Sequence, residues 1–262
     1  MIGFQHTISV DSPQFQGGNR YNFASWSDGG AQSHTIAVPA TDQAYSANFN
    51  LVSSAPAGLV AAYNFNEGNF GTLYDVSGHG NHGTLEGPIW TGTGKYGGAL
   101  SFDGINDVVT VNDADSLDFT TGFSLEAWVN PTSAGNWSSV LFKQGPQGMN
   151  YSLYANNGTN KPVAQVYLSN AEQNAPGTGP VPLNTWTHLA ATYDGTTLRL
   201  YANGVLAGSK AISGSLLNTP NPLTIGGNAV WSEFFQGQID EVRLYNRALT
   251  ATEIQNDMAT PL

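Results

Sequence analysis

The chain has 262 residues, of which 31 are Gly, 13 are Pro and none is Cys. The lack of cysteine excludes a disulfide framework, a thiolate zinc site and a cysteine nucleophile. Charged residues make up 10% of the chain, and 8 Lys+Arg against 19 Asp+Glu give a net charge of −11. Nucleic-acid backbones and anionic membranes bind proteins through clustered Lys and Arg side chains. The sequence has no such cluster, so we expect neither nucleic acid nor a membrane as a partner. No apolar run approaches the roughly 20 residues that a membrane span needs, so we expect no membrane insertion.

Short runs of alternating apolar residues, separated by Gly, Asn, Asp and Pro, dominate the sequence and predict an all-β sandwich. In the first part of the chain the expected strands are 6–10, 21–26, 34–38 and 45–49. In the remainder they are 59–65, 99–102, 107–111, 123–129, 139–143, 150–155, 163–168, 186–193, 197–201, 205–207, 223–225 and 238–245. Asp194-Gly195 and Asn203-Gly204 predict hairpin turns, because these dipeptides accept the positive φ that tight hairpins need.

One short helix is predicted near the end of the chain. Thr250 and Glu253 form a capping-box pattern, in which each side chain accepts a hydrogen bond from the other residue's backbone amide. The segment 52–58 is small, polar and Pro/Gly-bearing, which is typical of a linker. We therefore expect a β segment over 1–51, a linker over 52–58 and a larger β domain over 59–262.

The segment 1–51 is marginal in size for an independent domain and begins directly on an expected strand. We interpret it as the C-terminal part of a preceding sandwich domain. Its open sheet edge is expected to pair with the main domain or with another copy of the chain. The Lys-poor, Gly/Asn/Thr-rich composition is typical of secreted proteins, whereas Met1–Phe4 has no features of a signal peptide. These observations favour a piece of a longer secreted, multidomain protein.

Seven segments carry a resemblance to a known family. They are 58–65 (GLVAAYNF), 75–83 (DVSGHGNHG), 99–104 (ALSFDG), 123–129 (FSLEAWV), 186–195 (WTHLAATYDG), 198–204 (LRLYANG) and 237–249 (GQIDEVRLYNRAL). In this order they resemble the laminin-G-like jelly-roll family of the concanavalin A-like fold, and 23–36 is similar to the tail of small immunoglobulin-like bacterial repeats. The resemblance implies two antiparallel sheets packed face to face. It also implies a mostly non-catalytic module of secreted hydrolases or adhesins, often with calcium and in some members with a bound glycan.

The glycine-rich segment 75–83 is the candidate metal site. Glycines let the backbone turn so that carbonyl oxygens point inward, and calcium takes six to eight oxygen ligands. By the resemblance, Asp75 and Asp240 would supply carboxylates, and Asn81 and His82 would supply main-chain oxygens. The alternative is that the polar side chains only form Asx-turn hydrogen bonds within the loop. The oxygen ligands expected at this site suit calcium better than zinc, so we do not expect a zinc ion.

Five residues are candidate ligand contacts. Trp137, Tyr151, Tyr154 and Trp231 lie in or near polar Gly/Asn-rich segments, where an aromatic ring can stack on a sugar; the alternative is ordinary packing at the ends of the sandwich. Glu126 shares a strand face with Ser124 and Trp128 and is either a sugar-contacting acid or a structural one. The adjacent acids Asp240 and Glu241 are expected to point to opposite faces of their strand.

The residues favour a non-catalytic module that binds a carbohydrate or matrix polysaccharide, with a structural calcium ion. Glycosidases need two facing carboxylates, and no strand carries acids at alternating positions. The net negative charge favours neutral over acidic glycans. Two alternatives stay open: a structural or adhesive β-module of extracellular assemblies, and a glycoside-active enzyme on the same fold.

Overall fold

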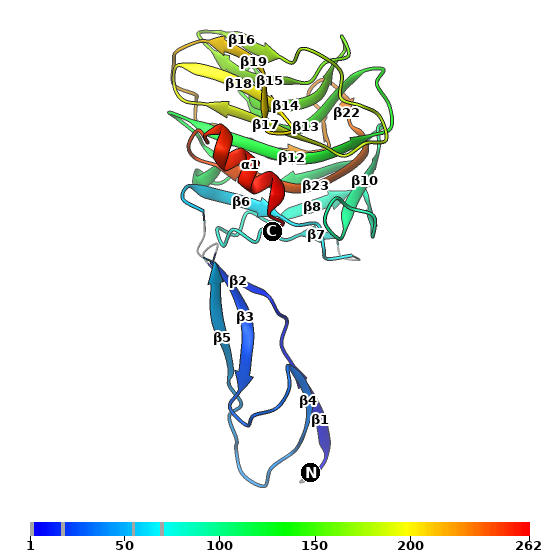
Figure 1. Ribbon diagram of the computed structural model, residues 1–262, viewed down its shortest axis with the longest axis vertical. Coiled ribbons are helices and arrows are strands. Elements are labelled where there is room, and N and C mark those ends of the chain that lie inside the picture. The colour runs from blue at the N-terminus through cyan, green and yellow to red at the C-terminus, as the bar shows by residue number, and fades with distance from the viewer. Residues whose placement is uncertain (1–2, 17–18, 54–55, 69–70) are drawn as a thin grey trace. The chain divides into compact units, whose positions relative to one another are not determined.

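A computed structural model describes residues 3–16, 19–53, 56–68 and 71–262. The chain divides into two compact units, Met1–Ala57 and Gly58–Leu262. Both are built of antiparallel β-strands, and the second also carries a short helix, shown in red (Figure 1). The expected all-β class is therefore confirmed.

The first unit consists of two small sheets over the residues described. One pairs β1 (Gln5–Ser9) with β4 (Ser33–Ala37), and the other has the order β2 (Gln14–Gln16), β3 (Asn19–Trp26), β5 (Ala47–Ser53). Strand β5 extends into the segment expected to be a linker. Trp26 is 9% exposed and packs against the rings of Phe23 and His34. Most other described residues of these strands are half-buried or exposed, so this unit has little core of its own.

The second unit is a sandwich of two eight-stranded antiparallel sheets, as counted over its described residues. The first sheet, which we call the helix-side sheet, has the order β19-β18-β17-β12-β23-β10-β9, with β6 also pairing with β23. Its strands are β6 (Leu59–Tyr63), β9 (Ile89–Thr91), β10 (Ala99–Asp103), β12 (Phe123–Pro131), β17 (Thr187–Tyr193), β18 (Thr197–Ala202), β19 (Val205–Ala211) and β23 (Gln236–Tyr245).

The second sheet, which we call the open-side sheet, has the order β16-β15-β14-β13-β20-β11-β8-β7. Its strands are β7 (Thr72–Leu73), β8 (Gly83–Glu86), β11 (Val108–Val111), β13 (Trp137–Gly145), β14 (Gly148–Asn157), β15 (Val163–Leu168), β16 (Ala171–Pro176) and β20 (Leu223–Ile225). A single 3-10 turn, η1 (Asp115–Leu117), and the short pair β21 (Gly227–Asn228) and β22 (Glu233–Phe234) complete the described elements that precede the helix.

The core lies between the two sheets. Alternate residues of β12, namely Leu125, Ala127 and Val129, join one apolar cluster with residues of the open-side sheet such as Leu141 and Leu153. All five side chains are fully buried. This arrangement confirms the predicted two-sheet sandwich and leaves the other face of each sheet turned outward.

The C-terminal helix α1 (Ala251–Ala259) lies across the outer face of the helix-side sheet (Figure 1). Its predicted capping box is present: Thr250 Oγ1 accepts from Glu253 N at 3.3 Å, and Glu253 Oε2 accepts from Thr250 N at 2.8 Å. Ile254 anchors the helix in an apolar cluster with Leu59 and Tyr245. No helix among the residues described is long and apolar enough to cross a membrane.

Candidate functional site

The glycine-rich loop 75–83 is organised around the Asp75 carboxylate. Oδ1 of Asp75 accepts hydrogen bonds from the backbone amides of Ala62 (3.0 Å) and Ser77 (2.8 Å), and Oδ2 accepts one from Asn81 N (2.9 Å). The Asn81 carbonyl accepts the buried Tyr63 hydroxyl at 2.6 Å. His82 Nδ1 accepts from Asp75 N at 3.0 Å. Since a carboxylate offers about four lone-pair sites, three of those of Asp75 are already used.

Asp240 holds a different part of the chain. Its Oδ2 accepts from Tyr96 N at 2.9 Å and its Oδ1 from Glu241 N at 2.7 Å. Burial raises the pKa of Asp240 to about 7, an effect that the Glu241 charge reinforces and the backbone hydrogen bonds oppose.

Three of the four expected metal ligands therefore already accept hydrogen bonds from the protein itself. The oxygens of Asp75 and Asp240, and the Asn81 carbonyl, are engaged by donors of the protein itself, and the two carboxylates support separate segments. In the described part of the chain, no group of three or more His, Asp or Glu residues is placed to hold a metal ion. The calcium ion remains a prediction. The structure itself shows a loop that is held by hydrogen bonds to the Asp75 carboxylate.

Glu126 is not placed to contact a sugar. Its side chain is fully buried on the outer face of the helix-side sheet, where β12 lies beneath α1 (Figure 1). Within the described structure, neither of its carboxylate oxygens has a hydrogen-bond partner. Burial raises the pKa of Glu126 well above its usual value, and the negative charge of Asp257 adds to this effect. The interpretation of Glu126 as a structural acid is the one that this position supports.

The expectation that Asp240 and Glu241 point to opposite faces is wrong. Strand β23 bulges against β12, so that Asp240 lies opposite Trp128 while Arg243 lies opposite Glu126. Glu241 takes a positive φ of 52° at the bulge and accepts a 2.9 Å hydrogen bond from Arg243. The extra residue brings both acids to the outer face, because a bulge interrupts strict alternation.

Tyr151 belongs to the core and is unavailable to a ligand. Its ring is fully buried among Phe119 and Phe123, with centroids 5.0 and 5.3 Å away. Its hydroxyl donates to Leu117 O at 2.8 Å. The prediction of Tyr151 as a ligand contact is corrected accordingly.

The structure brings the other three predicted aromatic residues together. Trp137, Tyr154 and Trp231 line one cleft of about 250 Å³ with Gln165, Glu172 and Glu233. The Trp137 ring meets the Tyr154 ring edge-on, with centroids 5.2 Å apart. Tyr154 on β14 and Gln165 on β15 place the cleft on the outer face of the open-side sheet, because their sequence neighbours Leu153 and Ala164 face the core.

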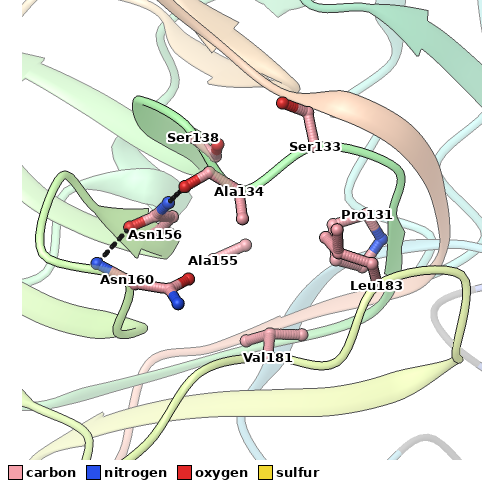
Figure 2. A pocket seen from close by; sticks show the side chains of 9 residues that line it. All are labelled: Pro131, Ser133, Ala134, Ser138, Ala155, Asn156, Asn160, Val181 and Leu183. Atoms are coloured by element: carbon pink, nitrogen blue, oxygen red, sulfur yellow. Dashed lines mark hydrogen bonds between the residues drawn. The ribbon is translucent and has the colours of Figure 1, made fainter.

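Asn156 fixes the loop that leads to Trp137. Its Nδ2 donates to Ala134 O at 2.6 Å and its Oδ1 accepts from Asn160 N at 3.0 Å. Figure 2 marks both hydrogen bonds with dashed lines. These residues surround an enclosure of about 10 Å³, which is room for about one water molecule. Gly158, at φ +72°, packs so close that a Cβ would lie 3.0 Å from Trp137 Nε1. Trp137 is therefore held from two sides.

Trp231 is held on one face and open on the other. Its ring meets Phe142 edge-on at 5.4 Å, and its amide donates to Asn228 Oδ1 at 2.9 Å. A Cβ on Gly148 would approach the Trp231 ring to 2.8 Å, so glycine is what allows this packing. The side chain stays 39% exposed and offers an apolar surface to the cleft.

Polar contacts orient the floor of the cleft. The Tyr154 hydroxyl donates to Glu233 Oε2 at 2.7 Å, and Asn228 Nδ2 donates to the same oxygen at 3.1 Å. Burial and the Glu233 charge raise the pKa of Tyr154 and keep its hydroxyl protonated. Gln165 is fixed by Ser152 Oγ at 3.2 Å and by its own donation to Asn174 Oδ1 at 2.9 Å.

Sequence reasoning missed Gln165, Glu172 and Glu233. Strand β16, which carries Glu172, has the sequence AEQNAP and lacks apolar alternation. Glu233 follows Trp231 by two residues, and this proximity was the one available signal.

A larger hollow of about 370 Å³ beside Trp90 is lined otherwise by Phe65, Asn66, Thr91 and glycines and carries no charged side chain among its described lining.

The chain resembles proteins that share this sandwich. The chain matches domain 4 of AbnA, a GH43 extracellular arabinanase of Geobacillus stearothermophilus, in complex with arabinotriose, with 22% identity and a TM-score of 0.63 over 76% of this chain and 98% of that one. The botulinum neurotoxin serotype D ligand-binding domain, in complex with N-acetylneuraminic acid, matches with 15% identity and a TM-score of 0.59 over 77% of this chain and 50% of that one. At these identities the likeness shows the fold.

A sequence relative and a family model complete the comparison. Mouse (Mus musculus) pappalysin-1 is 39% identical over 80 residues, which are 29% of this chain and 5% of that protein. This chain thus spans a small part of the length of that relative. The model of the concanavalin A-like lectin/glucanases superfamily matches residues 103–255, more than half of the chain. The protein is therefore a member of the concanavalin A-like lectin/glucanases superfamily, in its laminin-G-like branch.

Proposed function

We propose that this protein is a carbohydrate-binding module and that the cleft between Trp137 and Trp231 holds the sugar. The observation that carries this proposal is the convergence of two accessible tryptophans with three polar side chains in one cleft, which the buried Tyr154 supports. Aromatic faces supply apolar contact to a sugar ring, and a few fixed polar groups set its orientation. Trp137 and Trp231 are already held by Gly158 and Gly148, which lowers the entropic cost of ordering them on binding.

The relatives support this proposal in two respects. The arabinanase domain and the neurotoxin domain were both observed with a saccharide bound. The arabinanase is also an extracellular protein, which supports secretion as the location of this chain. A module of this kind acts by holding its parent protein on a glycan.

The experiment is a binding titration of the full chain against a panel of neutral, acidic and amine-bearing oligosaccharides. We expect Trp137→Ala and Trp231→Ala each to lower the affinity for the glycan by about tenfold or more, as for central aromatic contacts at other interfaces. Tyr74→Ala is the matched control, because Tyr74 is 46% exposed and lies beside β7 at the other end of the same sheet. Absence of binding to every glycan, or unchanged affinity in both tryptophan variants, would contradict the proposal.

Glycoside hydrolysis is the second candidate, and one observation favours it. Glu172 and Glu233 line the same cleft, and glycosidases act through a pair of carboxylic acids. Release of reducing ends from a bound oligosaccharide, lost in Glu172→Gln and Glu233→Gln, would establish an enzyme. Binding without release of reducing ends would favour the non-catalytic carbohydrate-binding module over the enzyme.

The first unit supports a further part of the proposal, self-association through its strands. Strands β1 and β4 pair only with each other in the described residues, so each leaves an open edge. Such edges accept a strand from another copy, and a charge placed on them blocks the pairing. A mass measurement over a range of concentrations should show dimers for the parent chain and fewer for Thr7→Lys. A monomer at every concentration would contradict this part.

A further inference from the structure

The charge of the cleft has a single sign. Glu172 and Glu233 contribute carboxylates, and its described lining includes no lysine or arginine. Glu172 is exposed at the edge strand β16. The cleft therefore combines negative charge with aromatic walls on a chain whose net charge is −11.

The two carboxylates have capacity left for a ligand. Glu233 Oε2 is occupied by Tyr154 and Asn228, whereas Oε1 accepts no hydrogen bond from the residues described. Glu172 makes no hydrogen bond or ion pair within the same set of residues. Glu172 and Glu233 Oε1 thus offer the cleft acceptors that the protein itself leaves unused.

An aromatic wall adds to the attraction for a cation. The face of a tryptophan or tyrosine ring carries negative electrostatic potential and attracts ammonium groups. Trp137 and Trp231 provide two such rings in the same cleft as the carboxylates, whereas Tyr154 is fully buried. Acidic sugars meet the opposite situation, because their carboxylates would approach Glu172 and Glu233 without a neutralising side chain in the cleft.

We propose that the cleft prefers glycans with free amino groups, that is, chains of deacetylated hexosamine. This inference rests on the proposed glycan-binding function and specifies its ligand class. The ring stacks on the tryptophans, while its ammonium group donates hydrogen bonds to Glu233 Oε1 and to Glu172. The negative net charge of the chain favours the approach of such a polycation at low ionic strength.

The test uses three hexasaccharides that share a β-1,4-linked backbone and differ at carbon 2: cellohexaose with hydroxyls, the acetylated glucosamine hexamer, and the free-amine glucosamine hexamer. Calorimetric titration of the full chain at pH 6 and low salt should give an affinity for the free-amine hexamer about tenfold above the other two. The preference should fall as salt screens the charges.

Variants separate the contribution of charge from that of stacking. Glu172→Gln, at an exposed position, should reduce the preference for the free amine while preserving affinity for cellohexaose. Glu233→Gln should also reduce the preference for the free amine, with its thermal melting temperature measured to verify folding. Trp137→Ala should lower the affinity for all three hexasaccharides. Glu86→Gln is the matched control, an exposed acid on β8 of the same sheet, and should behave as the parent.

Three results would overturn the inference. Equal affinity for the three hexasaccharides contradicts the amine preference and leaves the glycan-binding function standing. No binding of any hexasaccharide contradicts the inference, and the wider panel then decides the function. Binding of hexalysine as tight as that of the free-amine hexamer would show recognition of charge on a peptide and not of a sugar.

Discussion

The Tyr154 hydroxyl donates a 2.7 Å hydrogen bond to Glu233 Oε2 and thereby ties β14 to the turn that carries Trp231. Tyr154 itself is fully buried. One contact therefore links the floor of the cleft to one of its walls, so the stability of the fold and the shape of the cleft depend on the same hydroxyl.

Tyr154→Phe should lower the free energy of unfolding by about 1–2 kcal/mol, because it leaves a carboxylate with one donor fewer. Urea denaturation measures this change. Tyr167→Phe is the control on the neighbouring strand β15, because no hydrogen bond to its hydroxyl is present in the described structure. Equal stability of the two variants would mean that the Tyr154–Glu233 bond is not maintained in solution.

Asp75→Ala should lower the free energy of unfolding by about 2–4 kcal/mol, since the carboxylate accepts three backbone hydrogen bonds. We expect this loss equally in EDTA and in excess calcium, because all three donors belong to the protein. Melting curves in both solutions check it. A bound calcium ion would instead make EDTA lower the melting temperature of the parent, with recovery in calcium and no such response in Asp75→Ala.

Glu126→Gln should stabilise the protein at neutral pH. The unfolded chain ionises above the ordinary pKa of 4.5, whereas burial keeps the folded carboxyl protonated to a much higher pH. A group with a raised folded-state pKa gives full stability below its unfolded pKa and loses it as pH rises, by about 1.4 kcal/mol per unit. The gain from Gln should therefore grow between pH 5 and pH 8 in urea denaturation. A gain that does not vary with pH would show that Glu126 is ionised in the native state.

His188→Phe should protect the protein against acid. Burial, with the Arg243 charge adding to it, lowers the pKa of His188 from 6.5 to about 3. The unfolded chain binds a proton below pH 6.5 and the folded one does not, so stability falls as the pH drops toward 3, by about 1.4 kcal/mol per unit. The stability difference between pH 7 and pH 4.5 should shrink in His188→Phe and stay unchanged in the exposed control His6→Phe.

Thr250→Ala should cost about 1 kcal/mol, because it removes the N-terminal cap of α1. Thr252→Ala, an exposed position inside the same helix, serves as control. Thermal unfolding of both variants measures the difference. A loss confined to Thr252→Ala would contradict the capping role.

Much of this fold could be predicted from the sequence, because local sequence patterns and the burial of side chains indicate the same strands and turns. The Asp194-Gly195 and Asn203-Gly204 turns lie where expected, between β17, β18 and β19. The capping box at Thr250 is likewise a local pattern. By contrast, β16 was not predicted, because as an edge strand it carries mostly exposed polar residues and lacks alternation.

The candidate site was predictable only in part. Trp137 and Trp231 were identified because tryptophan in a Gly/Asn-rich segment is unusual for a core. Tyr151 and Tyr154 were both chosen from one strand, although residues three apart in a regular strand face opposite ways. Glu126 was placed on a face that α1 later covers, a contact between segments more than 120 residues apart in the sequence. No local pattern reports such a contact.

The two outward faces of the sandwich differ in what covers them. Helix α1 closes one, and the cleft opens on the other. Because the chain contains no cysteine, a cysteine introduced at the exposed helix position Asn256 would carry its sole thiol. Molecules immobilised there would present the tryptophans to the solution in a uniform orientation.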